Sequence, residues 1–355
     1  MNNQIRPRIT QEEFEILKDI RTRHEALANE CELNGIPIQD VKHYWFKGDH
    51  FSINVANRGK GYMEVRDEII DSMTKYSPQY KYPTRDKVLK QDDYHLLVVD
   101  PADIHIGKLS SAFETGEDYN VDIAVKRVME GVYGIIEKSS GFKKDRILYV
   151  IGNDILHVDT PKRQTTSGTP QDTDGMWYDN FLIAKQMHIE IIEVLREIAD
   201  VYVQYDPSNH DYTNGFFLAD TINSWFSKDK AVMFNCSIAH RKYFRYHNNL
   251  IGTTHGDGAK EADLPMLMAH EAGLDWSECK HKYFYVHHLH HKRSKDYMGV
   301  NVETLRSPSG ADSWHSKMGY VHAPKAIEGF LHHKLHGQIA RFCHIFSIIA
   351  ILIIF

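Results

Sequence analysis

Short apolar runs alternate with amphipathic stretches from residue 94 onward. Apolar runs bounded by polar residues indicate buried strands, and apolar positions spaced three or four apart indicate helices. The predicted strands are 95–99, 147–151, 201–205 and, as the last clear strand, 283–286, with a hairpin over 243–254. The predicted helices are 121–139, 180–199 and 216–226. Strands that alternate with helices favour an α/β layered fold, in which functional residues lie in loops beyond the strand ends.

The first 90 residues carry a different, mainly helical pattern. A capping-box-like start at Thr10 precedes apolar residues at helical spacing, and residues 34–37 (Asn-Gly-Ile-Pro) then indicate a turn. A second helix is predicted from Gln39 to Trp45, so the segment has the pattern of a DNA-binding helix-turn-helix. A small helical hairpin packed on the main domain fits the same pattern equally well. Residues 76–93 are polar, contain two prolines and are predicted to be a linker.

The pattern therefore divides the chain into an N-terminal region over 1–90, a main domain over 91–341 and an apolar tail over 342–355. The tail is too short to span a bilayer as a helix. A buried strand, an interfacial segment and a non-native end all remain open for it. No membrane role is expected.

The amino-acid composition excludes few classes of function. A hydrophobic content of 42% and a charged content of 25% are ordinary for a soluble globular protein. The net charge of -6 provides no overall attraction to nucleic acid, so DNA binding would need a local basic surface. The four cysteines form no CxxC pair and no signal peptide is evident, so a reduced, cytoplasmic setting is expected. The unusual feature is the 23 histidines, since imidazole is the commonest transition-metal ligand.

Five polar clusters each follow a predicted strand or hairpin. They are Asp103-Ile104-His105, Asp154 with His157, Ser208-Asn209-His210-Asp211, His255-Gly256-Asp257 and His287-His288-Leu289-His290-His291. A single Asp or His at a strand end usually makes an ordinary capping contact, so no one cluster is informative. Five of them at equivalent positions would gather many ionisable groups in one cleft, which is costly unless cations neutralise them. Carboxylate, imidazole and amide ligands suit Mn²⁺, Fe²⁺ or Zn²⁺, so the sequence predicts two divalent ions bridged by one carboxylate.

The ordered set Asp-x-His, Gly-Asn-Asp, Asn-His-Asp, His-Gly and His-x-His resembles the calcineurin-like metallophosphoesterase family over about residues 94–291. The resemblance implies a double-layered β-sandwich flanked by helices, with two metal ions, manganese being expected ahead of iron or zinc. The residues implied to hold one ion are Asp103, His105, Asp154 and His290, and those implied to hold the other are Asp154, Asn209, His255 and His288. His210 matches the family histidine beside the scissile phosphate. His287 and His291 are left as outer contacts or substrate-binding candidates.

The stretch after Asp154 resembles one branch of that family. A histidine three residues after the bridging aspartate and a proline four further on, here His157 and Pro161, are similar to the DNA repair nucleases of the SbcD type. In those enzymes this histidine contacts the phosphodiester. The resemblance therefore places His157 at the substrate and favours a nuclease.

Three positions depart from the family pattern. Ser208 stands where glycine is usual, His287 stands where glycine usually precedes His-x-His, and Asn153 intervenes between Gly152 and Asp154. The first two substitutions place side chains where the backbone is usually tight, so an altered loop geometry is expected there.

Two further segments bear on the substrate. Lys162 and Arg163 open a polar stretch that could bind phosphates or could simply be a solvated connection. Later candidates for shaping the cleft are 306–310, Trp314, His315 and 331–334. A surface loop and an ordinary helix are the favoured interpretation of these later segments. They show no clear match to the DNA-binding cap of the repair nucleases.

The sequence therefore predicts a two-metal phosphodiesterase that cleaves nucleic acid, foremost a DNA exonuclease in which a metal-activated hydroxide attacks phosphorus. His157 would stabilise the charge, and His210 would assist the leaving oxygen. One alternative is a phosphatase or small-nucleotide phosphodiesterase, which the net acidity and the missing cap favour. Another is a DNA-binding regulatory protein that uses residues 11–47 and has a vestigial metal site. The expected partners are DNA, a second copy of the chain and a separate ATPase, in a bacteriophage or bacterial repair setting.

Overall fold

The computed structural model describes residues 93–346 without interruption, together with 22, 25–33, 41, 43–47, 52–56, 67–68, 70–71 and 75. The chain divides into two compact units, Met1–Thr74 and Lys75–Phe355. Nearly all of the predicted linker over 76–93 lies outside the described residues.

The first unit combines helix with a small sheet. Residues 25–33 are helical, and β1 (His43–Lys47) pairs antiparallel with β2 (Ser52–Ala56). The second helix predicted over 39–45 is therefore wrong where the structure describes it, because residues 43–45 belong to β1. Three consecutive aromatic residues in this strand explain the difference, since aromatic side chains favour extended backbone. The described residues thus lack the second helix of the predicted helix-turn-helix.

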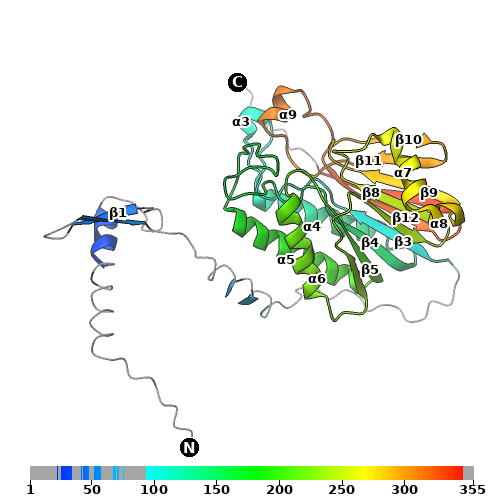
Figure 1. Ribbon diagram of the computed structural model, residues 1–355, viewed down its shortest axis with the longest axis horizontal. Coiled ribbons are helices and arrows are strands. Elements are labelled where there is room, and N and C mark those ends of the chain that lie inside the picture. The colour runs from blue at the N-terminus through cyan, green and yellow to red at the C-terminus, as the bar shows by residue number, and fades with distance from the viewer. Residues whose placement is uncertain are drawn as a thin grey trace, which may run out of the picture. The chain divides into compact units, whose positions relative to one another are not determined.

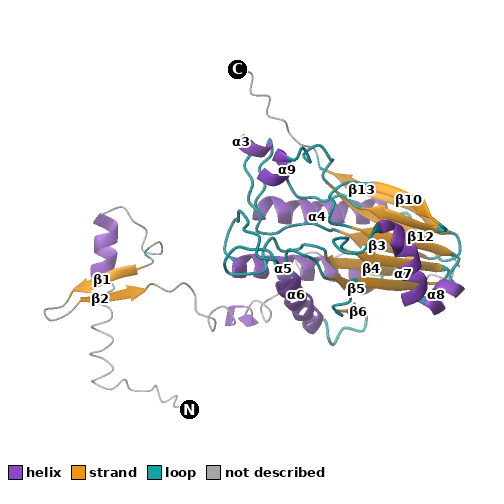
Figure 2. Ribbon diagram, turned by 45° about the horizontal axis from the view of Figure 1, so that its top comes forward, coloured by secondary structure: helices purple, strands orange, loops and turns teal. Residues whose placement is uncertain are grey.

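The second unit contains two sheets stacked face to face, as Figure 2 shows. In spatial order the six-stranded sheet contains β13 (Gly337–Ile345), β12 (Ala326–His333), β3 (His95–Asp100), β4 (Lys144–Gly152), β5 (Asp200–Asp206) and β6 (Val232–Asn235). The five-stranded sheet contains β10 (Arg293–Tyr297), β11 (Val300–Thr304), β9 (His281–Val286), β8 (Asn249–Thr254) and β7 (Arg241–Tyr246). Strands β3 to β6 run parallel, and so do β8, β9 and β11.

Helices cover the outer faces of both sheets (Figure 1). The six-stranded sheet is covered by α4 (Val121–Lys138), α5 (Trp177–Arg196) and α6 (Tyr212–Trp225). The five-stranded sheet is covered by α7 (Leu264–Glu271) and α8 (Gly273–Glu278). Three short elements lie in the connections: α3 (Ala112–Thr115), the 3₁₀ helix η2 (Glu261–Asp263) and α9 (Ser313–Lys317).

Strand β3 shows why the sequence forms this layered core. Leu96 and Val98 pack between the two sheets, whereas Leu97 and Val99 pack against the helices on the other face. Because both faces are buried, the strand is an uninterrupted apolar run rather than an alternating one. The predicted fold class is confirmed: the unit is a mixed α/β structure of two sheets flanked by helices.

The C-terminal part of the chain differs most from prediction. The strand at 283–286 is not the last, because β10, β11, β12 and β13 follow it. Residues 331–333 belong to β12 and not to a helix, and the boundary predicted after residue 341 falls inside β13. The beginning of the predicted tail is therefore a strand, whereas residues 347–355 lie outside the described part. Pairing of β12 with β3, far away in sequence, stabilises this region, and a local pattern does not reveal such partners.

None of the helices in the described part of the chain combines the length and the apolar character needed to cross a bilayer.

A buried histidine beneath the sheet makes the fold sensitive to acid. The hydroxyl of Tyr149 in β4 lies 2.7 Å from Nδ1 of His188 in α5, and burial lowers the pKa of His188 from 6.5 to about 3. Between these two values the unfolded chain binds a proton that the folded chain does not bind, so the free energy of unfolding decreases as the pH falls. His188→Gln is expected to reduce the loss of stability between pH 7 and pH 5 by about 2 kcal/mol. Urea unfolding of both proteins at the two pH values measures this, and an equal loss in both would contradict it.

Candidate active site

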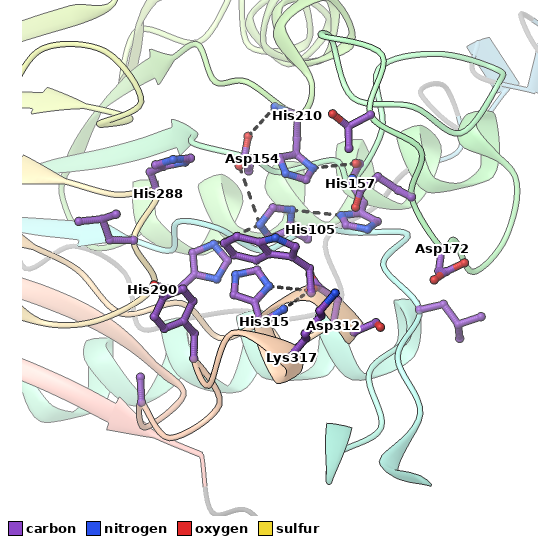
Figure 3. A pocket seen from close by; sticks show the side chains of 18 of the residues that line it. His105, Asp154, His157, Asp172, His210, His288, His290, Asp312, His315 and Lys317 are labelled. Carbon is purple, nitrogen blue, oxygen red and sulfur yellow. Dashed lines mark hydrogen bonds and ion pairs between the residues drawn. The ribbon is translucent and has the colours of Figure 1, made fainter. Parts of the chain in front are cut away.

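The five polar clusters lie in the loops that follow β3, β4, β5, β8 and β9. Because these strands are parallel within each sheet, their carboxyl ends lie on the same edge and bring the clusters together. Two groups of side chains place one ligand atom each within 4.8 Å of one another: Asp103 with His105 and His290, and Asp154 with His255 and His288. Several of these side chains converge on one cavity, as Figure 3 shows.

Asp154 lies between the two groups. Its Oδ2 is 3.9 Å from Nε2 of His105 and 3.3 Å from Nε2 of His255. Nε2 of His255 also lies 2.8 Å from Oδ1 of Asn209. In the first group, Nε2 of His290 is 3.3 Å from Nε2 of His105 and 3.5 Å from Oδ1 of Asp103. The structure thus brings together all seven residues that the sequence predicted as metal ligands.

The ligand loops are held in a strained backbone conformation. Six residues in them have positive φ angles between 52° and 70° although they are not glycine: Asp103, His105, Asn153, Asp154, His288 and His290. Each such residue costs about 1–2 kcal/mol, which the surrounding structure must offset. Gly152, with a φ of 96°, lies so close to β5 that an added Cβ would be 2.0 Å from the carbonyl oxygen of Asp206. Strain concentrated in this way indicates that the loops are shaped to aim their side chains at a common point.

The electrostatics of the two groups favour a bound cation. Burial would lower the pKa of His255, but the carboxylate of Asp154 outweighs burial and raises it to about 9. Burial would likewise raise the pKa of Asp154, but the imidazoles of His255 and His210 lower it. His255 is therefore protonated at neutral pH, and the second group carries a positive charge beside the carboxylate of Asp154. In the first group, burial keeps His105 neutral by lowering its pKa well below 6.5, so its ring presents a lone pair.

The donor set therefore fits divalent metal ions. Two buried carboxylates face three imidazoles whose pKa values burial lowers, those of His105, His288 and His290. A cation would relieve the repulsion between their lone pairs and would take the place of the proton on His255. Oxygen and imidazole ligands of this kind suit several divalent metals, so the donor set alone does not select one.

Two polar side chains behind Asp154 hold its loop in place, and the sequence assigned them no role. The hydroxyl of Ser208 accepts a hydrogen bond from the backbone N–H of Asp154 at 2.8 Å and donates to Oδ1 of Asp211 at 2.6 Å. Asp211 also accepts from the backbone N–H of Leu156. Burial first, and then the charge of Asp154, raise the pKa of Asp211 to about 7. Serine at position 208 therefore links two segments of the site.

His157 and His210 stack on each other beside the first group. Their ring centroids are 5.3 Å apart at an interplanar angle of 20°. Nδ1 of His210 lies 3.0 Å from the carbonyl oxygen of His157, so Nδ1 carries the proton and Nε2 is left for other contacts. Nδ1 of His157 lies 3.3 Å from Nδ1 of His105. If His105 offers Nε2 to a metal, its Nδ1 must donate this hydrogen bond, so His157 also orients a ligand.

Two other groups of metal-type side chains occur in the described residues, and neither adds an independent site. His105, His157 and His210 form one, but His105 cannot offer Nε2 to the first group and Nδ1 to another ion while it remains a neutral imidazole. Asp93, His95 and His333 form the other, at the opposite end of β3. There the backbone N–H groups of residues 335 and 336 donate to Nδ1 of His333, so its Nε2 carries a proton, which Asp93 accepts at 3.2 Å.

His287 does not have the predicted role in substrate binding. The side chain is fully buried, Nδ1 lies 2.9 Å from the carbonyl oxygen of Thr254, and Nε2 lies 3.0 Å from both carboxylate oxygens of Asp100. Both ring nitrogens are therefore occupied by protein partners. The charge of Asp100 overcomes the effect of burial and raises the pKa of His287, so the two residues form a buried ion pair. This pair joins the end of β3 to the loop that carries His288.

Breaking that pair is expected to destabilise the whole unit. Asp100→Ala would leave a buried imidazole without its counter-charge, at a cost of about 3 kcal/mol in the free energy of unfolding. Urea unfolding at pH 7 measures the change. Asp257→Ala, which removes an exposed carboxylate from a neighbouring loop, is the matched control and should change stability by less than about 0.5 kcal/mol. Equal stabilities of the two variants would contradict this account.

The polar stretch after His157 lines the cavity with its later residues and not with the predicted Lys162 and Arg163. Lys162 and Arg163 are exposed and are not among the residues that line the cavity. Residues 169–172 of the same loop do line it. The basic start of the stretch therefore has no contact with the site in this structure, because the intervening residues fold back against the loop after β4.

The segment between β11 and β12 is part of the site, contrary to the favoured interpretation as a surface loop. Ser307 and Ser309 are fully buried, and the hydroxyl of Ser307 donates to the backbone carbonyl of Asp103 at 2.7 Å. The cavity has a volume of about 1000 Å³, and α9 with its flanking residues forms one of its walls. Trp314 and His315 line it, which agrees with the less favoured of the two interpretations. Lys108 and Asp312, which the sequence did not single out, tie this wall to the loop after β3 through a 2.9 Å ion pair.

Comparisons with known proteins do not assign a family. No protein-family model matches the sequence, and no curated protein matches it. Solved structures that match include an archaeal phosphodiesterase, with 8% identity, coverage of 71% of this chain and 99% of that chain, and a TM-score of 0.33. Vacuolar protein sorting 29 of Cryptosporidium parvum has 13% identity, 72% and 100% coverage and a TM-score of 0.33. The Entamoeba histolytica protein of the same name, complexed with zinc, has 12% identity, 70% and 98% coverage and a TM-score of 0.29.

Proposed function

We propose that this protein is a metal-dependent phosphodiesterase that hydrolyses nucleic acid, with linear DNA as substrate and Mn²⁺ as the metal. The observation that carries the proposal is the position of Asp154 between two ligand groups, beside the stacked histidines His157 and His210. The first group, with Asp154, would hold one ion. The second group, with Asn209, would hold the other. Two ions held in this way polarise a phosphoryl oxygen and lower the pKa of water.

The side chains of the cavity supply orientation and proton transfer. Nδ1 of His210 is engaged by the backbone of His157, so the proton that reaches the leaving oxygen would come from Nε2 of the doubly protonated ring, which would be left neutral with its proton on Nδ1. The backbone N–H of His210 also donates to Oδ1 of Asp154 at 3.0 Å, which fixes the imidazole relative to the ligand groups. A phosphodiester that contacts both groups would therefore meet His210 at a fixed distance.

DNA and exonuclease action are supported by the resemblance of Asp154, His157 and Pro161 to SbcD-type nucleases and by the size of the cavity. A cavity of about 1000 Å³ exceeds what a phosphate monoester requires. On this proposal a separate ATPase, a second copy of the chain or both would assist cleavage of duplex DNA.

A substrate panel in the presence of Mn²⁺ tests the proposal. The panel contains single-stranded DNA, linear duplex DNA, circular DNA, RNA, a cyclic nucleotide and a phosphate monoester. We expect mononucleotides to be released from linear DNA, no cleavage of circular DNA, and complete loss of activity in EDTA. Hydrolysis of the monoester or the cyclic nucleotide without cleavage of DNA would favour the phosphatase or small-nucleotide phosphodiesterase instead. Cleavage that persists in EDTA would overturn the metal dependence.

A further inference from the structure

Two aromatic side chains on the α9 wall of the cavity remain exposed to water. Trp314 and Tyr320 both line the cavity, and each residue is 58% exposed. Their ring centroids are 5.8 Å apart at an interplanar angle of 52°. Isolated exposed apolar residues are common, but a contacting aromatic pair within a cavity beside a reactive centre is typical of a ligand-binding surface.

The wall that carries these rings is fixed to the ligand loops. Oδ1 of Asp312 accepts hydrogen bonds from the backbone N–H of His315 at 2.9 Å and from its Nδ1 at 2.7 Å, which caps α9. Oδ2 of Asp312 pairs with Nζ of Lys108, a buried lysine three residues after His105. The aromatic pair is therefore preorganised relative to the metal-ligand groups, and binding to it would need little additional ordering.

A continuous series of ring contacts leads from the first ligand group to this wall. His315 stacks on His290, with centroids 5.2 Å apart at 17°, and Trp314 packs edge-on against His315 at 5.1 Å. Figure 3 shows His290 and His315 side by side in the cavity. A group attached to a phosphate at the ligand groups would therefore reach Trp314 within the same cavity.

The charge on this wall suits a phosphate-linked ligand. Lys317 and His322 line the cavity on the same side as the aromatic pair, and Lys317 is exposed. The acidic side chain of Asp312 on this wall is neutralised by Lys108. A flat aromatic face with a cation near it matches a nucleobase and its backbone phosphate, and stacking of this kind tolerates any base.

We propose that Trp314 and Tyr320 form a stacking site for a nucleobase of a single strand whose adjacent phosphodiester lies at the metal-ligand groups. This inference rests on the proposed phosphodiesterase function for the nature of the strand. The site selects nucleic acid over other phosphodiesters, without sequence preference, because it contacts the face of the base.

The experiment compares a single-stranded oligothymidylate with an abasic oligonucleotide of equal length, both in Mn²⁺. Trp314→Ala and Tyr320→Ala should each raise KM for the oligothymidylate about tenfold and leave KM for the abasic strand unchanged. Trp314→Phe should keep most of the affinity because it retains an aromatic face. Phe217→Ala, which removes an aromatic residue of similar exposure (55%) from α6, should change neither KM. Equal effects of Trp314→Ala on both strands, or no effect on either, would overturn the proposal.

A binding measurement separates this inference from the proposed function. Fluorescence anisotropy of the two labelled strands is recorded without added metal, so that no cleavage is required. Base-dependent binding that Trp314→Ala removes, without any cleavage by the unmodified protein, would support the stacking site and overturn the proposed activity. Cleavage of DNA by a protein that binds the two strands with equal affinity would support the proposed activity and overturn the stacking site. Absence of both binding and cleavage would overturn both.

Discussion

Replacing Asp154 with asparagine is expected to lower phosphodiester hydrolysis by about 10³-fold and to weaken metal binding at both ligand groups. The reason is geometric, since one carboxylate oxygen faces His105 of one group and His255 of the other. Asparagine retains an oxygen that can accept the hydrogen bond from the backbone of His210, so the loop should keep its conformation while the charge is lost. Activity on linear DNA and isothermal titration with Mn²⁺ measure the two effects.

The matched control is Asp257→Asn. Asp257 is exposed, lies two residues after His255 and belongs to neither ligand group. This variant should keep activity and metal binding within a factor of about 2, since surface substitutions are usually small in effect. Retention of more than a tenth of the activity by Asp154→Asn, with normal metal binding, would show that Asp154 does not serve both groups.

Replacing His210 with alanine is expected to lower the rate of DNA hydrolysis by about 10²–10⁴-fold while metal binding remains. His210 contributes no atom to the two ligand groups, and its ring is held against His157 with Nε2 as the nitrogen available for proton transfer. A substrate with a better leaving group needs less help from an acid. The variant should therefore lose much less activity on a p-nitrophenyl ester of thymidine phosphate than on DNA.

His240→Ala provides the comparison for His210. His240 is an exposed histidine near Tyr212 and does not line the cavity. His240→Ala should leave the rate of hydrolysis unchanged on both DNA and the p-nitrophenyl ester. An equal loss of activity by His210→Ala on DNA and on the p-nitrophenyl ester would mean that the imidazole binds or orients the phosphate and does not deliver a proton to the leaving oxygen.

The site positions that the sequence could predict share one property: they follow from the local order of strands and polar residues. The strand at 95–99 was predictable because both of its faces are buried, which makes the run apolar throughout. Asp103, Asp154 and His255 were predictable because each follows such a strand or hairpin, and parallel strands bring their ends together. The backbone strain at these positions was not predictable, since nothing in the residue type of Asp154 requires a φ of 60°.

The errors also share a cause. Residues 331–333 carry no local signal that distinguishes a helix from a strand, and they are a strand because they pair with β3, more than 200 positions earlier. His287 looked like a member of a histidine cluster facing substrate, but its ring is buried and lies against Asp100. The difference between a buried partner and an exposed ligand depends on which face of a loop a side chain occupies, and that is set by tertiary packing.

The sequence by itself determined the layered α/β class and the five polar clusters from which the candidate ligands come, because the order of strands and polar clusters is a local property of the chain. Only the tertiary structure placed Asp154 between the two groups, buried the pair of His287 and Asp100, and brought the wall of Trp314 and Tyr320 over the cavity. Those features depend on contacts between residues that are distant in sequence. A local sequence pattern does not show which of these contacts will form.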